Sequence, residues 1–245
     1  MREQRIIVVT GGAMGIGEAA VHRFVANGDF VYILDVEADQ GAEVAAQAKA
    51  SKFLQCDVTS ELNIGEATDL ISEEAGRIDV LVNNAGGFPK PRNTEETTID
   101  DWHRTMELNL TSVFLMSRAA LPLLRRSRGG RIVNIGSLAG QTAGWKTSPP
   151  YAAAKAGVHA LTRVMATELA GEGITVNALA PSAVKTERIR KLRDEDEMRA
   201  TAADIPLGRY QSADEISGWI LFLASEEAGF MTGQTVSVNG GRFMS

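Results

Sequence analysis

Short apolar runs rich in β-branched residues alternate along the chain with longer segments in which apolar residues recur at helical spacing. Several short runs are apolar at consecutive positions, as in strands that are buried on both faces of a sheet. The alternation predicts one α/β domain over residues 1–245, a doubly wound and mostly parallel sheet of seven strands flanked by helices. The predicted strands are residues 6–10, 30–35, 52–56, 80–83, 131–135, 175–180 and 235–238, and the predicted helices are residues 15–26, 62–74, 99–124, 151–170 and 214–223.

Three stretches fall outside this alternation. Residues 86–98 and 140–150 have no regular period and are expected to form loops. Residues 185–199 are densely charged, and we expect a short helical excursion there, within a small lid near residues 185–205.

Composition and charge narrow the function classes. The chain carries a formal net charge of −6, which disfavours a surface for nucleic acid or for an anionic membrane. Cys56 is the one cysteine, so no intrachain disulfide forms and a reducing compartment is expected. The apolar run at residues 6–9 is too short for a signal segment or a membrane span, and we expect a soluble cytoplasmic protein.

A glycine-rich loop joins the first predicted strand to the first predicted helix. It reads T-G-G-A-M-G-I-G from Thr10 to Gly17, so the spacing is G-x-x-x-G-x-G rather than the commoner G-x-G-x-x-G. Glycines let the backbone approach a ligand closely, and the helix N-terminus offers N–H groups and a positive dipole end to a pyrophosphate. The alternative interpretation is a tight strand–helix turn that binds nothing.

Acidic residues stand at the ends of the next two predicted strands. Asp35 is placed to accept hydrogen bonds from the ribose hydroxyls of a dinucleotide, and it would repel a 2′-phosphate. Neither Met14 nor Val36 offers a cation to that phosphate, which favours NAD over NADP. Asp57 could bond the adenine amino group, with Val58 behind the ring. For both aspartates the alternative is a cap at the start of the following helix.

Tyr151 and Lys155 are four positions apart and therefore share one face of a predicted helix. A free tyrosine has a pKa of about 10, too high for a general base at neutral pH. An ammonium one turn away, beside the positive nicotinamide of an oxidised cofactor, would lower that pKa. The pair could then exchange a proton with an alcohol or a ketone. The alternative is an ordinary solvent-facing pair.

Ser137 follows a predicted strand, at the sheet edge where open α/β sheets bind their ligands. Its hydroxyl is placed to hold a substrate oxygen near Tyr151. A hydrolase triad is not expected, because the chain lacks a G-x-S-x-G motif and His22, His103 and His159 have no evident partner. One cysteine and three scattered histidines also predict no metal site.

Together these motifs resemble those of the short-chain dehydrogenase/reductase family, in its short form of about 250 residues. The resemblance covers essentially the whole chain, with the motifs in the family's order. Beyond the glycine loop, the matching motifs are N-N-A-G at residues 83–86, Asn109, Ser137, Tyr151, Lys155, N-A-L-A-P at residues 177–181 and the last strand at residues 233–241.

The resemblance implies a Rossmann-type fold, a homotetramer, and hydride transfer between a substrate carbon and a nicotinamide. It implies that Tyr151 is the general acid/base and that Lys155 binds the nicotinamide ribose and lowers the tyrosine pKa. Ser137 would orient the reacting oxygen, and Asn109 would hold a water in a proton relay. The implied cofactor-binding residues are Gly11, Ala13, Met14, Gly15, Ile16, Gly17, Asp35, Val36, Asp57, Val58, Asn84, Ala85, Gly86, Tyr151, Lys155, Pro181, Val184 and Thr186.

Two features depart from the family pattern. Ser182 follows Pro181 where the family usually has glycine, so the loop near the nicotinamide is expected to take a different path. Ser137 and Tyr151 are one position further apart than is common, which predicts an insertion within residues 145–150 at the pocket rim.

The sequence constrains the substrate less than it constrains the fold and the type of reaction. The chain looks most like the 3-oxoacyl-carrier-protein reductase branch, whose members generally use NADPH, whereas Asp35 favours NAD. The first interpretation is an NAD-dependent dehydrogenase of a secondary alcohol or polyol, and the alternative is reduction of a 3-oxoacyl thioester with NAD(P)H. A non-catalytic cofactor sensor is disfavoured because every catalytic position is filled. The rim segments carry cations that could bind an anionic substrate or could belong to a solvated polar lid, namely Lys90, Arg92, Lys146, Arg188 and Arg190.

Overall fold

Seven strands form one parallel sheet in the order β3-β2-β1-β4-β5-β6-β7. The computed structural model describes residues 3–87, 91–142 and 147–244, with only the backbone of residues 188 and 192. The predicted fold class is confirmed. The strands are β1 (Ile6–Thr10), β2 (Phe30–Asp35), β3 (Ser51–Gln55), β4 (Val80–Asn83), β5 (Arg131–Ile135), β6 (Thr175–Pro181) and β7 (Thr235–Val238).

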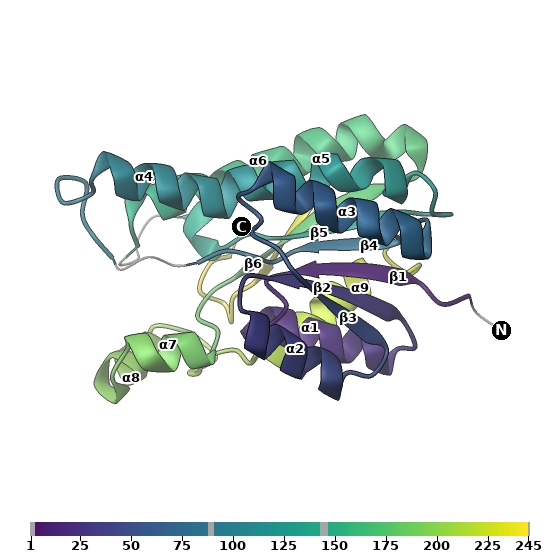
Figure 1. The fold of residues 1–245 in the computed structure, drawn as a ribbon. Helices are drawn as coiled ribbons and strands as arrows, with labels where there is room; N and C mark the ends of the chain where they lie inside the picture. The colour runs from purple at the N-terminus through teal and green to yellow at the C-terminus, as the bar shows by residue number, and fades with distance from the viewer. Residues whose placement is uncertain (1–2, 88–90, 143–146, 245) are drawn as a thin grey trace.

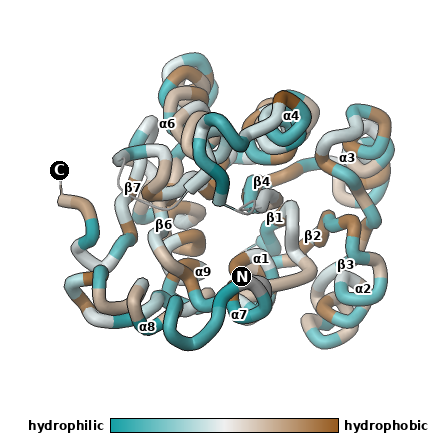
Figure 2. Tube along the Cα trace, turned by 90° about the vertical axis from the view of Figure 1, so that its left-hand side faces the viewer, coloured by the Kyte–Doolittle hydropathy of each residue, from teal (hydrophilic) through white to brown (hydrophobic). Residues whose placement is uncertain are grey.

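Helices cover both faces of the sheet. They are α1 (Gly15–Ala26), α2 (Ala38–Gln47), α3 (Glu61–Ala75), α4 (Ile99–Met106), α5 (Ser112–Leu124), α6 (Pro149–Leu169), α7 (Glu187–Leu192), α8 (Glu195–Ala203) and α9 (Ala213–Leu223), with short turns η1 (Glu107–Thr111), η2 (Leu138–Gly140) and η3 (Ala170–Glu172). In Figure 1, α3, α4, α5 and α6 lie on one side of the strands and α1, α2 and α9 on the other. Figure 2 shows the same two layers from the side.

Each central strand contributes to two cores, because alternate residues of a strand face opposite sides of the sheet. In β1, Ile7 and Val9 pack in the core beneath α1 and α9, whereas Val8 packs in the core beneath α3 and α5. All three side chains are fully buried. This two-sided burial explains the consecutive apolar positions in the sequence.

The strand order reverses between β1 and β4, and this reversal positions the site. The chain leaves β1 toward one edge of the sheet and returns to β4 on its other side, so a crevice opens at the carboxyl ends of these two strands. The glycine loop follows β1, and the N-N-A-G segment begins at the end of β4. The fold therefore brings the two motifs together.

The structure differs from the sequence prediction in three helical regions. α2 is missing from the predicted helices, because most of its apolar residues are alanines and it buries only Gly41 and Val44. The predicted helix 99–124 contains the π-helical turn η1 around Asn109. The charged stretch forms two helices rather than one, because Asp194 starts α8 with a capping box to Glu197.

The helices α7 and α8 lie apart from the sheet, beside its carboxyl edge (Figure 1). They lie on the side on which the crevice opens. Within the described ranges, no helix is both long and apolar enough to cross a membrane.

Candidate active site

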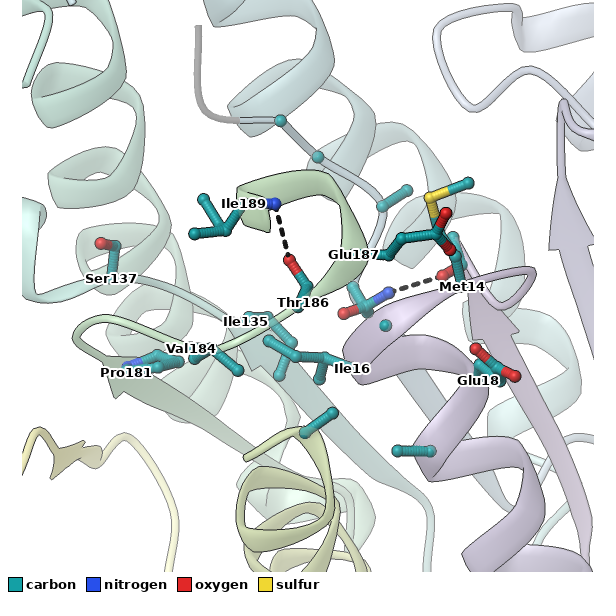
Figure 3. Close-up of a pocket in the computed structure, with 18 of the residues that line it drawn as sticks. Met14, Ile16, Glu18, Ile135, Ser137, Pro181, Val184, Thr186, Glu187 and Ile189 are labelled. Carbon is teal, nitrogen blue, oxygen red and sulfur yellow. Dashed lines mark hydrogen bonds between the residues drawn. The ribbon is translucent and has the colours of Figure 1, made fainter. Parts of the chain in front are cut away.

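A cavity of about 800 Å³ opens at the carboxyl edge of the sheet. Its walls come from the glycine loop, the ends of β2 to β6, α6 and the segment that leads into α7. In Figure 3, Thr186 lies between Ser137 at the end of β5 and Met14 of the glycine loop. Of the residues predicted for the site, the cavity is lined by Gly11, Met14, Gly15, Ile16, Asp35, Val36, Asp57, Val58, Asn84, Ala85, Gly86, Ser137, Tyr151, Lys155, Pro181, Val184 and Thr186.

The glycine loop packs tightly against the end of β4. Gly11 has a φ of 62°, and a Cβ there would lie 2.8 Å from the Ala85 Cα. A Cβ on Gly17 would lie 2.0 Å from the Gly11 carbonyl oxygen. At the N-cap of α1, Met14 provides no side-chain cap, so the N–H groups of the first turn are left to a ligand or to water. The loop therefore fits the pyrophosphate of a dinucleotide.

Asn84 holds the glycine loop to β4. Its Nδ2 donates to the carbonyl oxygens of Thr10 at 3.0 Å and Gly11 at 2.8 Å. The backbone N–H groups of Asn84 and Ala85 both donate to the Thr10 hydroxyl at 3.0 Å. The N-N-A-G segment thus shapes the loop as well as lining the cavity, a role that sequence reasoning missed.

Asp35 lies at one end of the cavity and also ties the glycine loop to β2. Its Oδ2 accepts a hydrogen bond from the Ala13 N–H at 2.9 Å, and its Oδ1 accepts one from the Glu37 N–H at 3.2 Å. Glu37, not Asp35, occupies the N-cap of α2. Glu18 and Glu37 also line the cavity, so this end of it is acidic.

Asp57 and Val58 follow β3 and line the same end of the cavity. The Asp57 Oδ1 accepts hydrogen bonds from the Thr59 N–H at 2.9 Å and the Thr59 hydroxyl at 2.8 Å. Ser60, not Asp57, caps α3. Asp57 therefore stabilises its own turn while facing the cavity.

Lys155 is a buried lysine on α6, only 4% exposed. Its Nζ donates to the Ile135 carbonyl oxygen at the end of β5 at 2.8 Å. Burial lowers the pKa of Lys155 to about 8. The Nζ lies 5.8 Å from the centroid of the Tyr151 ring. The lysine and the tyrosine therefore face one part of the cavity, as their spacing predicts.

Ser137 begins the turn η2 at the end of β5. Its Oγ accepts a hydrogen bond from the Ala139 N–H at 3.1 Å. Its backbone N–H donates to Nε2 of the buried His159 on α6 at 3.5 Å. A Cβ on Gly136 would lie 2.2 Å from that same nitrogen, so the ring packs directly against the backbone before Ser137. Sequence reasoning missed this support of Ser137 by His159.

We expect His159 to make the protein sensitive to acid. Burial, together with the charges of Lys155 and Arg163, lowers the pKa of His159 to about 4. An unfolded histidine titrates at about 6.5, so the unfolded state binds more protons between these two values. The free energy of unfolding should fall by on the order of 3 kcal/mol through this group as the pH drops across that window. Urea unfolding measures this pH dependence of stability, and His159→Gln should lose most of it.

His103 provides the matched control for this measurement. It is exposed on α4, so His103→Gln should keep the acid sensitivity of the wild type. Equal pH profiles for the wild type and His159→Gln would contradict a buried, neutral histidine.

Asn109 lies in η1 and does not line the cavity. Ala13 and Gly17, also among the residues predicted for the site, do not line it either. The Asn109 Oδ1 accepts a hydrogen bond from the Gly87 N–H at 3.0 Å, and its Nδ2 donates to the Thr105 carbonyl oxygen at 3.0 Å. Such π-helical turns recur at functional sites. Asn109 therefore fixes the backbone at the end of the N-N-A-G segment, and its role in a water relay stays a prediction.

Ser182 adopts an ordinary backbone conformation. In the described part of the chain, Lys49 is the one non-glycine residue with a positive φ. The expectation that the loop after Pro181 differs in path from the family's stays a prediction. The Ser182 hydroxyl donates to the Asn239 carbonyl oxygen at 3.1 Å and ties the end of β6 to the turn after β7. The predicted insertion within residues 145–150 lies partly outside the described residues.

Of the cations predicted for the rim, Arg190 lines the cavity. Lys90 and Lys146 lie outside the described residues. Arg92 forms an ion pair with Asp101 and does not line the cavity. Sequence reasoning missed a different group on the cavity wall, because its members come from separate segments that only the fold brings together. This group is Arg193, Tyr210 and Arg242.

Comparisons with known proteins identify the family. A family model described as enoyl-(acyl carrier protein) reductase matches residues 11–242. The 3-oxoacyl-[acyl-carrier-protein] reductase of Vibrio harveyi is 38% identical over 244 residues, which cover 99% of this chain and 98% of that protein. The trans-4-hydroxycyclohexanecarboxylate dehydrogenase of Sinomonas cyclohexanicum is 37% identical over 248 residues, which cover 97% and 92%.

A solved structure has the same fold over nearly the whole chain. The Pseudomonas aeruginosa RhlG/NADP active-site complex superposes with a TM-score of 0.92 and 34% identity, covering 97% of this chain and 96% of that chain. Sequence motifs, sheet order and relatives therefore agree. The chain belongs to the short-chain dehydrogenase/reductase family.

Proposed function

We propose that this chain catalyses reversible hydride transfer between NAD(H) and the reacting carbon of a secondary alcohol or ketone. Family membership makes it an oxidoreductase that acts on CH–OH groups. One observation supports the proposal most strongly: Tyr151, Lys155 and Ser137 line the same cavity as the glycine loop. A bound nicotinamide would supply or accept the hydride.

The protein's own task is to hold the substrate oxygen and to move one proton. The Tyr151 hydroxyl gives that proton to the carbonyl oxygen during reduction and takes it back during oxidation. Burial lowers the pKa of Lys155 only to about 8, so its ammonium is still mostly charged at neutral pH and favours the phenolate form of Tyr151. Because the Ser137 Oγ accepts a bond from the Ala139 N–H, its own proton is available to the substrate oxygen.

The acidic end of the cavity supports NAD as the preferred cofactor. A 2′-phosphate there would approach the carboxylates of Glu18, Asp35 and Glu37. Met14 stands in the glycine loop where a cation would be needed to offset them. The RhlG structure contains NADP, which favours NADP as the cofactor instead. Titration of the protein with NADH and NADPH distinguishes the two.

The double substitution Met14→Arg with Asp35→Ser should shift the ratio of kcat/KM for NAD over NADP by about 100-fold toward NADP. It removes the negative charge of Asp35, which would repel the 2′-phosphate, and adds a cation at position 14 beside the expected phosphate. Fluorescence titration with NADH and NADPH measures the same shift as a ratio of Kd values. Asp39→Ser, in the first turn of α2 and outside the cavity wall, is the control and should keep the wild-type ratio. A wild type that prefers NADPH would contradict the proposal.

Three substrate classes fit the reaction. The 3-oxoacyl-[acyl-carrier-protein] reductases among the relatives favour a 3-oxoacyl thioester more strongly than a simple secondary alcohol or polyol. The hydroxycyclohexanecarboxylate dehydrogenase favours a hydroxy acid.

Absorbance of the reduced nicotinamide distinguishes these classes. The test compares acetoacetyl-coenzyme A and 4-oxocyclohexanecarboxylate, each with NADH, and a panel of polyols and secondary alcohols with NAD. Turnover of any one of them identifies the class, and turnover of none would contradict the proposed function.

A further inference from the structure

A second polar group lines the cavity besides the proton-transfer residues. It consists of Arg193, Tyr210 and Arg242, which we call the arginine cluster. We propose that the arginine cluster binds an oxyanion of the substrate, a carboxylate or a phosphate, and so selects substrates that carry a negative charge. The inference rests on the proposed function for the reaction, but it concerns recognition rather than proton transfer.

Arg242 is a buried cation held by the turn that follows β7. Its side chain is 6% exposed, yet it lines the cavity. The Asn239 Nδ2 donates to the Phe243 carbonyl oxygen at 3.0 Å, which closes the turn around Arg242. The Ser182 hydroxyl joins the same turn to the end of β6 at 3.1 Å. Arg242 is therefore positioned by the segment that leads from the sheet into the cavity.

The surroundings of Arg242 favour an added negative charge. Its ion pair with Asp204 spans 3.5 Å, and the Asp204 side chain is 72% exposed, so water screens the attraction. Burial lowers the pKa of Arg242 to about 10, and nearby Arg193 lowers it too, against the opposite effects of Asp204 and Tyr210. An anion bound between two partly desolvated cations would stabilise both.

Arg193 and Tyr210 complete the cluster from two other segments. Arg193 is the C-cap of α7, and its Nη1 donates to the buried Thr201 hydroxyl at 2.7 Å, which holds it against α8. Tyr210 precedes Gln211, whose backbone N–H donates to the Ala183 carbonyl oxygen at 3.0 Å. Among the described residues, the buried Tyr210 hydroxyl finds no hydrogen-bond partner. A buried hydroxyl in that state is unfavourable, and an oxyanion would accept its hydrogen bond.

The arginine cluster contrasts with the end of the cavity assigned to the cofactor. Glu18, Asp35 and Glu37 line that end and would repel a free anion. Glu187 and Asp214 line the cavity as well, so we attribute the selectivity to the placement of the cluster rather than to net charge. The two ends thus offer one acidic site and one site for an anion.

Four ketone probes test the proposal with Arg242→Gln and Arg193→Gln. The probes are 4-oxocyclohexanecarboxylate, its neutral methyl ester, acetoacetyl-coenzyme A, and acetoacetyl-N-acetylcysteamine, a thioester without phosphate. If the cluster binds a carboxylate, each variant lowers kcat/KM for the free acid by about 10- to 100-fold and spares the ester. If it binds a phosphate, the same loss appears with the coenzyme A thioester and not with the N-acetylcysteamine thioester.

Arg209→Gln is the matched control. Arg209 is an exposed arginine next to Tyr210, and it pairs with Glu215 instead of lining the cavity. This variant should retain the wild-type rates with all four probes. Equal losses for charged and neutral probes in the Arg193 and Arg242 variants, or a loss confined to the affinity for NADH, would overturn the proposal.

A second readout does not require turnover. With NADH present, cyclohexanecarboxylate or inorganic phosphate should raise the Tm of the wild type but not that of Arg242→Gln. An unchanged Tm in the wild type with both anions would overturn the proposal. If the wild type reduces none of the ketones, the proposed function fails, whereas the Tm measurement still decides whether the cluster binds an anion.

Discussion

Tyr151→Phe is expected to lower kcat for ketone reduction by about 1,000-fold while leaving the affinity for NADH within about threefold. The substitution removes one hydroxyl and keeps the ring, whose centroid lies 5.8 Å from the Lys155 Nζ. Without that hydroxyl, the proton for the substrate oxygen has to come from water, and the transition state loses its positioned acid. Single-turnover kinetics with NADH measure the chemical step, and fluorescence titration measures binding.

Tyr32→Phe is the matched control for this experiment. Tyr32 lies in β2, donates its hydroxyl to Glu74 at 3.1 Å and does not line the cavity. Its removal should leave kcat within about twofold of the wild type. If Tyr151→Phe kept more than about a tenth of the wild-type kcat, Tyr151 would not be the general acid/base.

Lys155→Met should lose activity and gain stability. Burial lowers the pKa of Lys155 from 10.5 to about 8, so at neutral pH the buried ammonium disfavours the folded state. Methionine removes that penalty, although the lost hydrogen bond to the Ile135 carbonyl oxygen offsets part of the gain. We expect the free energy of unfolding to rise by about 2 kcal/mol at neutral pH. We also expect kcat to fall by about 1,000-fold, since Tyr151 loses the neighbouring positive charge.

The difference in stability between the wild type and Lys155→Met should depend on pH. As the pH rises from about 8 to about 10.5, the unfolded state still holds a proton that the folded state has lost, so the wild type gains stability relative to Lys155→Met. Urea unfolding across that range measures the difference. Lys52→Met, which removes a half-exposed lysine paired with Glu74, is the control. Its free energy of unfolding should not change relative to that of the wild type across this pH range. A destabilised Lys155→Met with a parallel pH profile would contradict the buried charge.

The fold and the centre of the site were predictable because their signals are local in the sequence. The consecutive apolar residues of β1 report burial on both faces of one strand. The glycine loop is contiguous, and Tyr151 and Lys155 are one helical turn apart on α6. Each of these patterns needs only neighbouring residues to be recognised.

The remaining features depend on contacts between distant segments. Arg193, Tyr210 and Arg242 meet only after α7, the segment before α9 and the last turn have packed around the end of β6. His159 supports Ser137 across the contact between α6 and β5. The homotetramer involves surfaces of several chains, and it stays a prediction.

The central claim is that this cavity transfers a hydride to a ketone with a proton supplied by Tyr151. The most direct measurement is reduction of the ketone probes with NADH fully deuterated at C4, followed by mass spectrometry of the alcohol formed. We predict one deuterium bound to the carbinol carbon with the wild type, and almost no product over the same time with Tyr151→Phe. An alcohol without deuterium on that carbon, or no alcohol from any probe, would contradict the claim.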